Sequence, residues 1–286
     1  MPGYILGTNL SDAVTITKTT SGTMLLPLTG MQTKWAKGLT RGPANGTAFA
    51  AATLTIRLDF GASELIHGIA ALGLNGVDGS TMQVKLSTVA AGGYEVASSN
   101  NVWQPTGSND TLGQNIFWFP PGNYVFARYL ELGFTVEGRP SGERYVDIRR
   151  LLVMRGCVLP YGFDAGWSIN AIDQSTEILT PQGGVFVNEE GVYRQMAFSL
   201  TGLDEDEAKK NNNSYNNTDS LERVLQNYGK RKEVIVSPRH FATDRDQTEN
   251  TVYGRLAEWS PIRHRSGVYY DCESITVNEV WTPPLS

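Results

Sequence analysis

Histidine, serine and cysteine most often carry acid–base, nucleophilic or zinc chemistry, but their spacing in this chain supports none of these. The histidines are His67, His240 and His264. None lies four residues from another or beside a cysteine, so no zinc site is predicted. Counting residues leaves a Ser-His-Asp triad open, but no Gly-x-Ser-x-Gly turn is present to expose a nucleophile. We therefore predict no catalytic residues and no enzymatic activity.

Two polar stretches carry oxygen atoms that could hold calcium, residues 244–249 (DRDQTE) and 75–80 (NGVDGS). Neither has the loop length and terminal glutamate of an EF-hand, and a polar turn explains each more simply. The glycine-rich stretches 73–79 and 92–93 lack the pattern of a phosphate-cradling loop. The sequence therefore predicts no metal and no cofactor.

Aromatic side chains are the residues that could bind a ligand. An aromatic face can stack on the apolar C–H face of a sugar ring, and Trp103 and Tyr124 lie in or near a long polar stretch at 89–115. Trp35 precedes a turn-rich segment, where it could be a ligand platform or a plug at one end of a β-sandwich. Trp118 is flanked by apolar residues and is predicted to be core. The candidate glycan-contacting residues are Trp103, Trp35 and Tyr124.

Charge and hydropathy exclude several classes of partner. The net charge is −5 and the pI about 5.3, so no basic field attracts nucleic acid. No apolar run reaches the roughly 18 residues of a membrane span, and the N-terminus lacks the features of a signal peptide. We therefore expect no membrane insertion and assembly in a cytoplasm. There, Cys157 and Cys272 are expected as buried free thiols in preference to a disulfide.

Alternating apolar residues locate the strands of the first half of the chain. Residues 54–61 and 128–136 both have the period of half-buried strands and must share a core. Residues 64–74 fit a buried strand better than a helix because two glycines interrupt them, and residues 82–87 alternate again. These strands predict an antiparallel sandwich. Its expected core-facing residues are Leu54, Ile56, Leu58, Phe60, Leu130, Leu132, Phe134 and Val136, with Val146, Ile148, Leu152 and Met154 on one face of a last strand.

A turn-rich segment after Cys157 predicts a boundary between domains 1–157 and 158–286. In the second domain we expect a long strand at 192–201, one or two helical turns near 203–210, and one clear helix at about 219–228. A capping box and Gly229 bound this helix. Its apolar stripe supplies candidate subunit-interface residues, and strands at 233–237, 251–259 and 267–281 follow, the last with a bulge near Glu273 or Ser274. The stripe consists of Leu221, Val224, Leu225 and Tyr228.

The pattern of the first half, over roughly 30–157, resembles the galactose-binding-like (discoidin-type) jelly roll. The resemblance rests on Trp35, the LTIRLDFG strand at 54–61, ARYLEL at 127–132 and DIRRL at 147–151. It implies a jelly-roll β-sandwich whose end loops bind sugars or lipids, or one that serves only in structural packing. The disulfide common in extracellular members has no counterpart here, because no cysteine precedes Cys157.

The second half, over roughly 158–286, resembles phage distal-tail and tail-tube proteins. The resemblance rests on SLTGL at 199–203, the helix near 219, EVIVSP at 233–238 and the closing strands from Tyr253 through Glu279. It implies a β-barrel-like domain with one helix, so the whole chain is expected to be mainly β. The domain order departs from many distal tail proteins, which place the ring-forming domain first.

Together these resemblances imply a structural component of a phage virion, in the tail tip or baseplate and assembled in the host cytoplasm. Its copies would form a homo-oligomeric ring and contact neighbouring tail proteins or fibres. Closed symmetry would hide strand edges that otherwise pair without control. The alternative is a carbohydrate-binding module that aids attachment to a host surface, with glycans as partners.

Overall fold

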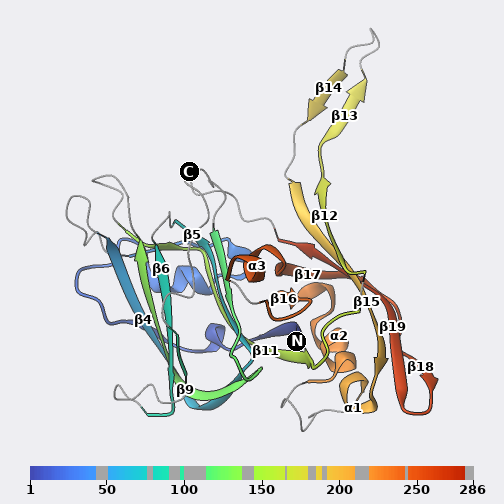
Figure 1. Cartoon of the computed structure of the whole chain (residues 1–286). Helices are drawn as coiled ribbons and strands as arrows, with labels where there is room; N and C mark the ends of the chain where they lie inside the picture. The colour runs from blue at the N-terminus through green and yellow to red at the C-terminus, as the bar shows by residue number, and fades with distance from the viewer. Residues whose placement is uncertain are drawn as a thin grey trace.

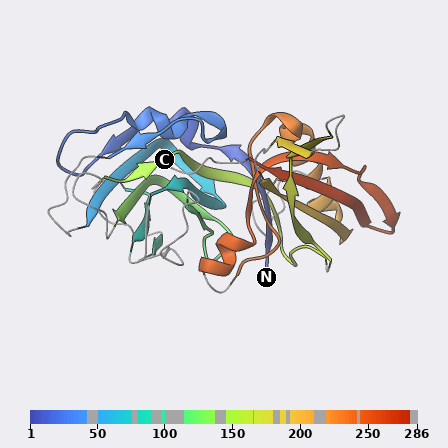
Figure 2. The same cartoon turned by 90° about the horizontal axis from the view of Figure 1, so that it is seen from above.

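The structure is a computed structural model of the chain. It describes residues 1–42, 51–75, 80–89, 97–99, 114–136, 145–164, 166–179, 185–188, 192–209, 219–241 and 244–280. These residues form mainly β-structure in curled sheets (Figure 1), which confirms the predicted fold class. Two lobes lie side by side, and the N-terminal strand passes between them (Figure 2).

One long antiparallel sheet runs through both lobes in the order β12-β15-β19-β17-β16-β1-β11-β5-β8, with β18 paired to β19. Strand β1 joins the lobes because it pairs with β11 on one side and β16 on the other. The predicted domain boundary after Cys157 lies inside β11. The strands are β1 (Gly3–Asn9), β5 (Gly68–Leu74), β8 (Gln114–Trp118), β11 (Arg150–Leu159), β12 (Ser168–Asp173), β15 (Val192–Leu203), β16 (Val234–Ser237), β17 (Val252–Trp259), β18 (Arg263–Ser266) and β19 (Tyr269–Glu279).

A second sheet, β2-β4-β9-β6-β7, faces the β11-β5-β8 end of the long sheet and completes the predicted sandwich. The two long predicted strands pair directly, with Ile56 opposite Leu132. Phe60 is only half-buried because the register shifts after Asp59, so the strict alternation ends there. The other predicted core residues of these two strands are buried. The strands are β2 (Ile16–Lys18), β4 (Ala52–Ile66), β6 (Thr81–Ser87), β7 (Ala97–Ser99) and β9 (Val125–Val136).

The shared sheet separates the sandwich core from a central core on its other face. Leu151 and Val153 of β11 point into the sandwich core, and Leu152 and Met154 into the central core. The prediction that Leu152 and Met154 share a face with Val146 and Ile148 is therefore wrong. Arg149 lies between β10 (Asp147–Ile148) and β11, and the chain changes faces at this break.

The helix α2 (Leu221–Tyr228) packs on the second lobe and ends at Gly229 as predicted. Its cap is the Ser220 side chain, which accepts a hydrogen bond from the backbone N–H of Arg223, so the helix begins two residues later than expected. Tyr228 lies against β1 at Gly7, where a Cβ atom would come within 2.3 Å of the phenol ring. Burial raises the pKa of Tyr228 to about 12. Helix α2 is therefore fixed to the strand that joins the lobes.

Several shorter elements complete the chain. The predicted bulge in the last strand is confirmed: Phe198 pairs with Ile275 and Leu200 with Cys272, which leaves one extra residue on β19. Segment 244–249, considered for calcium, is the helix α3, which the sequence did not predict. The remaining elements are α1 (Glu205–Ala208), α3 (Asp244–Glu249), β3 (Thr40–Arg41), β13 (Thr176–Leu179), β14 (Val185–Asn188), and the 3-10 turns η1 (Ser11–Ala13), η2 (Leu28–Gln32), η3 (Lys34–Ala36) and η4 (Gly229–Arg231).

Candidate functional site

The loop that carries Trp35 has an unusual backbone. Trp35 has φ 62° and ψ 27°, and Ala36 has φ 51°, both in the left-handed region that residues with a Cβ atom rarely adopt. Such backbone persists only where the surroundings hold it, and it clusters at binding and active sites. The Trp35 backbone N–H donates a 2.6 Å hydrogen bond to Oε1 of Glu233, which precedes β16 in the other half of the chain.

A buried charge network holds Glu233 in turn. The fully buried Arg150 guanidinium donates to Glu233 Oε2 at 2.6 Å and to both Asp12 oxygens at 2.6 and 2.8 Å. Burial alone would lower the pKa of Arg150, but these hydrogen bonds outweigh burial and raise it. The Tyr253 hydroxyl also donates to Glu233. Burial, and then the charge of Glu233, raise the pKa of Tyr253. Trp35 is thus anchored to the joint between the lobes.

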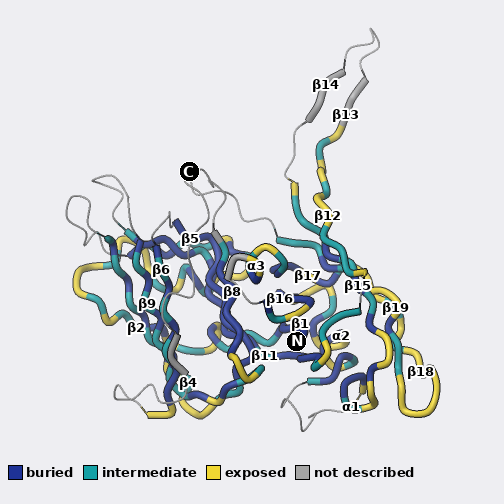
Figure 3. The backbone as a smooth tube through the Cα atoms, in the orientation of Figure 1, coloured by how far each residue is buried: buried dark blue, intermediate teal, exposed yellow. Residues whose placement is uncertain are grey.

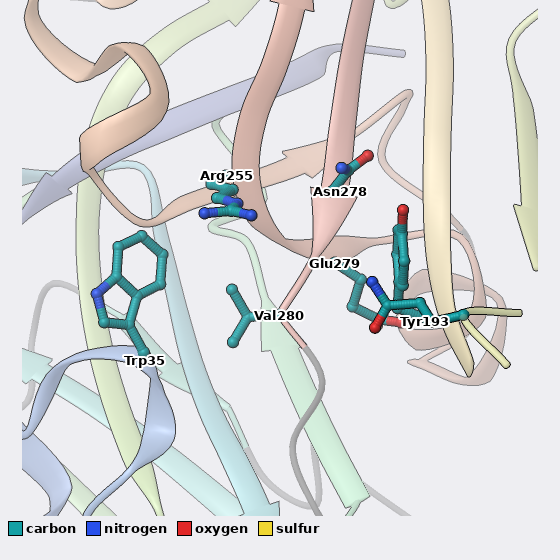
Figure 4. Close-up of a pocket in the computed structure, with 7 residues that line it drawn as sticks. Trp35, Tyr193, Arg255, Asn278, Glu279 and Val280 are labelled. Atoms are coloured by element: carbon teal, nitrogen blue, oxygen red, sulfur yellow. The ribbon is translucent and has the colours of Figure 1, made fainter. Parts of the chain in front are cut away.

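A pocket of about 290 Å³ lies beside Trp35. Its other walls come from the second lobe: the segment after β12, the start of β15, β17 and the end of β19. Figure 4 shows the indole of Trp35 on one side, Tyr193 and Glu279 on the other, and Val280 between them. The residues that line the pocket are Trp35, Gln174, Tyr193, Arg255, Asn278, Glu279 and Val280.

Strand pairing positions the polar groups of this wall. Arg255 of β17 pairs with Asn278 of β19, which pairs with Gln195 of β15, so these residues form one row across three strands. The Gln195 side-chain amide donates to Asn278 Oδ1 at 2.8 Å. Next to this row, Arg194 binds the Glu279 carboxylate at distances of 2.6 to 3.0 Å. The wall is therefore ordered before any ligand arrives.

This arrangement suits recognition more than reaction chemistry. Two aromatic rings offer flat apolar surfaces, and planar amide, guanidinium and carboxylate groups lie beside them. Such a mixture of apolar faces with a few convergent polar groups is typical of small-molecule sites. In the described parts of the chain, no group of three or more His, Cys, Asp or Glu side chains could hold a metal ion.

The candidate glycan-contacting residues are not brought together. Trp35 lines the pocket. Tyr124 is half-buried in the first lobe, where its ring makes T-shaped contacts with the rings of His67 and Phe126. Trp103 lies outside the described residues. Trp118 is buried in the sandwich core, as predicted.

The candidate subunit-interface residues are used inside the chain itself. All four side chains of the α2 stripe are buried, with exposed fractions of 0 to 4 %, in the core of the second lobe. The prediction that they contact a neighbouring subunit is corrected for that reason, because packing against β1 and the other strands already covers the stripe. The four residues are Leu221, Val224, Leu225 and Tyr228.

Other residues considered for chemistry have structural positions. His67 is fully buried, and its Nδ1 accepts a hydrogen bond from the Gly156 backbone N–H. Cys157 and Cys272 are buried free thiols, as predicted. No helix within the described segments is long and apolar enough to cross a bilayer.

Sequence reasoning missed every pocket residue except Trp35. Gln174, Tyr193, Arg255 and Asn278 belong to strands or turns whose sequence gives no sign of a site. The pocket residues are spread from position 35 to position 280, over nearly the whole chain. The wall becomes visible only once β15, β17 and β19 are paired.

Comparisons with known proteins show that part of the chain is similar in structure to solved sugar-binding modules. No family model and no curated protein matches the chain. About half of the chain is similar to the lectin domain of lectinolysin complexed with Lewis b antigen, at 15 % identity, 52 % coverage of this chain and 98 % of that one, with a TM-score of 0.36. A chitosan-binding module from Paenibacillus sp. IK-5 gives 16 % identity, coverages of 51 and 98 %, and a TM-score of 0.36.

A further similar structure is the family 32 carbohydrate-binding module of Clostridium perfringens NanJ in complex with galactose. It gives 15 % identity, covers 53 % of this chain and 100 % of that one, and has a TM-score of 0.36. Similarity at this level assigns neither a family nor a ligand to the chain.

Proposed function

We propose that this protein binds a saccharide in the pocket beside Trp35 and catalyses no reaction on it. The observation that carries the proposal is Trp35, whose backbone N–H is held by Glu233 and whose indole lies at the edge of a pocket with planar polar walls. A strained, anchored tryptophan of this kind is already in place before the ligand arrives, which reduces the entropy lost on binding.

The chemistry of the pocket matches the two kinds of surface on a sugar ring. Trp35 and Tyr193 offer faces for the apolar C–H side. Gln174 and Asn278 carry amide groups that can both donate to and accept from neighbouring hydroxyl groups. The volume of about 290 Å³ lies at the small end of ligand pockets, which fits one or two sugar rings.

Saccharide binding is tested with the full chain on an array of oligosaccharides, followed by calorimetric titration of the hits. We expect selective binding with a dissociation constant of about 10 to 1,000 µM, because a pocket of this size buries few ligand atoms. Trp35 lies in the pocket, so its fluorescence should change with the same midpoint. A blank array, together with flat titrations, would contradict the proposal.

A second proposed function is structural: the chain forms homo-oligomeric rings as part of a phage virion, assembled in the host cytoplasm beside other tail proteins. The observation that favours assembly is the β13–β14 hairpin, a separate two-stranded sheet that projects beyond the body of the protein (Figure 1). A two-stranded hairpin is marginally stable alone in water. Packing on a second copy of the chain would stabilise it.

Light scattering tests this second function. The intact chain is expected to have the mass of a closed oligomer at high concentration. A variant with residues 176–188 replaced by a short Gly-Ser turn is expected to have the mass of a monomer, because it lacks the projecting hairpin. Saccharide titration controls for folding, since the pocket lies outside the deleted strands. A monomeric intact chain, or a variant that still assembles, would contradict the role of the hairpin.

A further inference from the structure

The charged residues that line the pocket are Arg255 and Glu279, and Glu279 is already paired with Arg194 beside the wall. The Glu279 carboxylate is bound by the Nε and Nη2 atoms of Arg194, and it also accepts the Arg194 backbone N–H at 3.1 Å. Such a bidentate pair leaves little negative charge for a ligand. Arg255 remains as a second cation, and its side chain is exposed beside the pocket.

Arg255 differs from the other arginines of this region. Arg194 is bound to Glu279, and Arg150 to Glu233 and Asp12. Within the described residues, Arg255 makes no hydrogen bond and no ion pair with another side chain. Its guanidinium group therefore keeps its N–H donors for a ligand, since the one carboxylate in the pocket lining, Glu279, is bound by Arg194.

The hydrogen bond between Gln195 and Asn278 adds to this donor character. Asn278 Oδ1 already accepts from Gln195, which occupies one of its two lone pairs, while no described side chain is bonded to its Nδ2 amide, which donates. Arg255 and the Asn278 amide thus present donors, and a ligand that complements them carries acceptors and a negative charge. Figure 4 shows the Trp35 indole beside Arg255, with its ring nitrogen on the side away from Val280.

We propose that the pocket selects an acidic saccharide, a sugar bearing a carboxylate that pairs with Arg255 while its ring packs on Trp35. The guanidinium fork matches a carboxylate in a bidentate geometry that a neutral hydroxyl group cannot reproduce. Asn278 then binds a ring hydroxyl or the second carboxylate oxygen. This inference rests on the proposed saccharide binding and adds the class of sugar.

The test uses a panel of uronic-acid oligosaccharides, each paired with its carboxyl-reduced neutral counterpart, titrated into the full chain. The acidic member of a binding pair is expected to bind about 10- to 100-fold more tightly, the contribution of a hydrogen-bonded charge pair. Arg255→Gln should remove this preference by weakening the acidic member about 10- to 100-fold more than the neutral member. Added salt should weaken only the acidic member.

Arg263→Gln is the matched control, because Arg263 is an exposed arginine on β18 outside the pocket, paired with the exposed Glu273. It is expected to keep the preference. Equal binding of acidic and neutral members, or an acid preference that survives Arg255→Gln, overturns the inference and leaves saccharide binding standing. If no member of either series binds, both the inference and the proposed saccharide binding fall.

Discussion

Replacing Trp35 with alanine is expected to weaken saccharide binding by about 30- to 1,000-fold, the effect of losing a central aromatic contact of about 2–4 kcal/mol. The fold should persist, because alanine keeps the backbone N–H that donates to Glu233 and the indole is only half-buried. Calorimetric titration measures the affinity, and thermal unfolding of the same samples checks the fold.

Trp259→Ala is the matched control for Trp35→Ala. Trp259 is also a partly exposed indole, 36 % accessible, and it lies on β17 together with Arg255, but it does not line the pocket. Its replacement should change the affinity by less than about twofold. Unchanged binding by Trp35→Ala, or an equal loss in both variants, would show that Trp35 is a structural plug, the other interpretation of its sequence position.

Replacing Arg150 with alanine is expected to lower the free energy of unfolding by about 3–5 kcal/mol, because it leaves the buried Glu233 carboxylate without its cation. The effect is large since Arg150 is fully buried and binds Glu233 and Asp12 at 2.6 Å. Urea denaturation measures it. Because Glu233 also holds Trp35, saccharide affinity should fall in the same variant.

A double variant separates the charge from the packing. Arg150→Ala combined with Glu233→Ala should destabilise the protein by less than the sum of the single changes, because the buried Glu233 carboxylate is then no longer left without its cation, while Asp12 is 28 % exposed. Arg263→Ala removes one side of an ion pair whose side chains are 62 and 64 % exposed, and it should cost at most about 1 kcal/mol. Similar losses for Arg150→Ala and Arg263→Ala would contradict a stabilising role of the buried network.

The strands of the first half of the chain and their buried faces could be predicted from the sequence, because these strands lie at the surface of one core. Alternation in β4 and β9 predicts the buried face through Leu58 and Leu130, and these two residues pair directly. The faces of strand β11 could not be predicted in this way. Both of its faces are buried, between the sandwich core and the central core, so periodicity does not reveal the change of face at Arg149.

Helix α2 shows a different limit. Its apolar stripe and its end at Gly229 follow from local sequence and are confirmed, whereas its N-cap is Ser220 instead of the predicted capping box at Asp219. The partner of the stripe depends on residues far away: Gly7 on β1 leaves the space that the Tyr228 ring occupies. An apolar stripe on a helix predicts that another surface packs on it. The sequence does not say whether that surface belongs to the same chain or to a neighbouring subunit.

By itself, the sequence determined the strand-rich class, the sandwich strands, the position of α2 and the bulge in β19, because each depends on side-chain periodicity or backbone preference over a few neighbouring residues. Only the tertiary structure decided that one sheet unites the lobes and that Trp35 faces Arg255. That pocket exists because β1 pairs on both sides and Glu233 holds the Trp35 loop, contacts between residues about 200 positions apart. Local pattern does not encode which distant strands meet, so the site stayed hidden until they were paired.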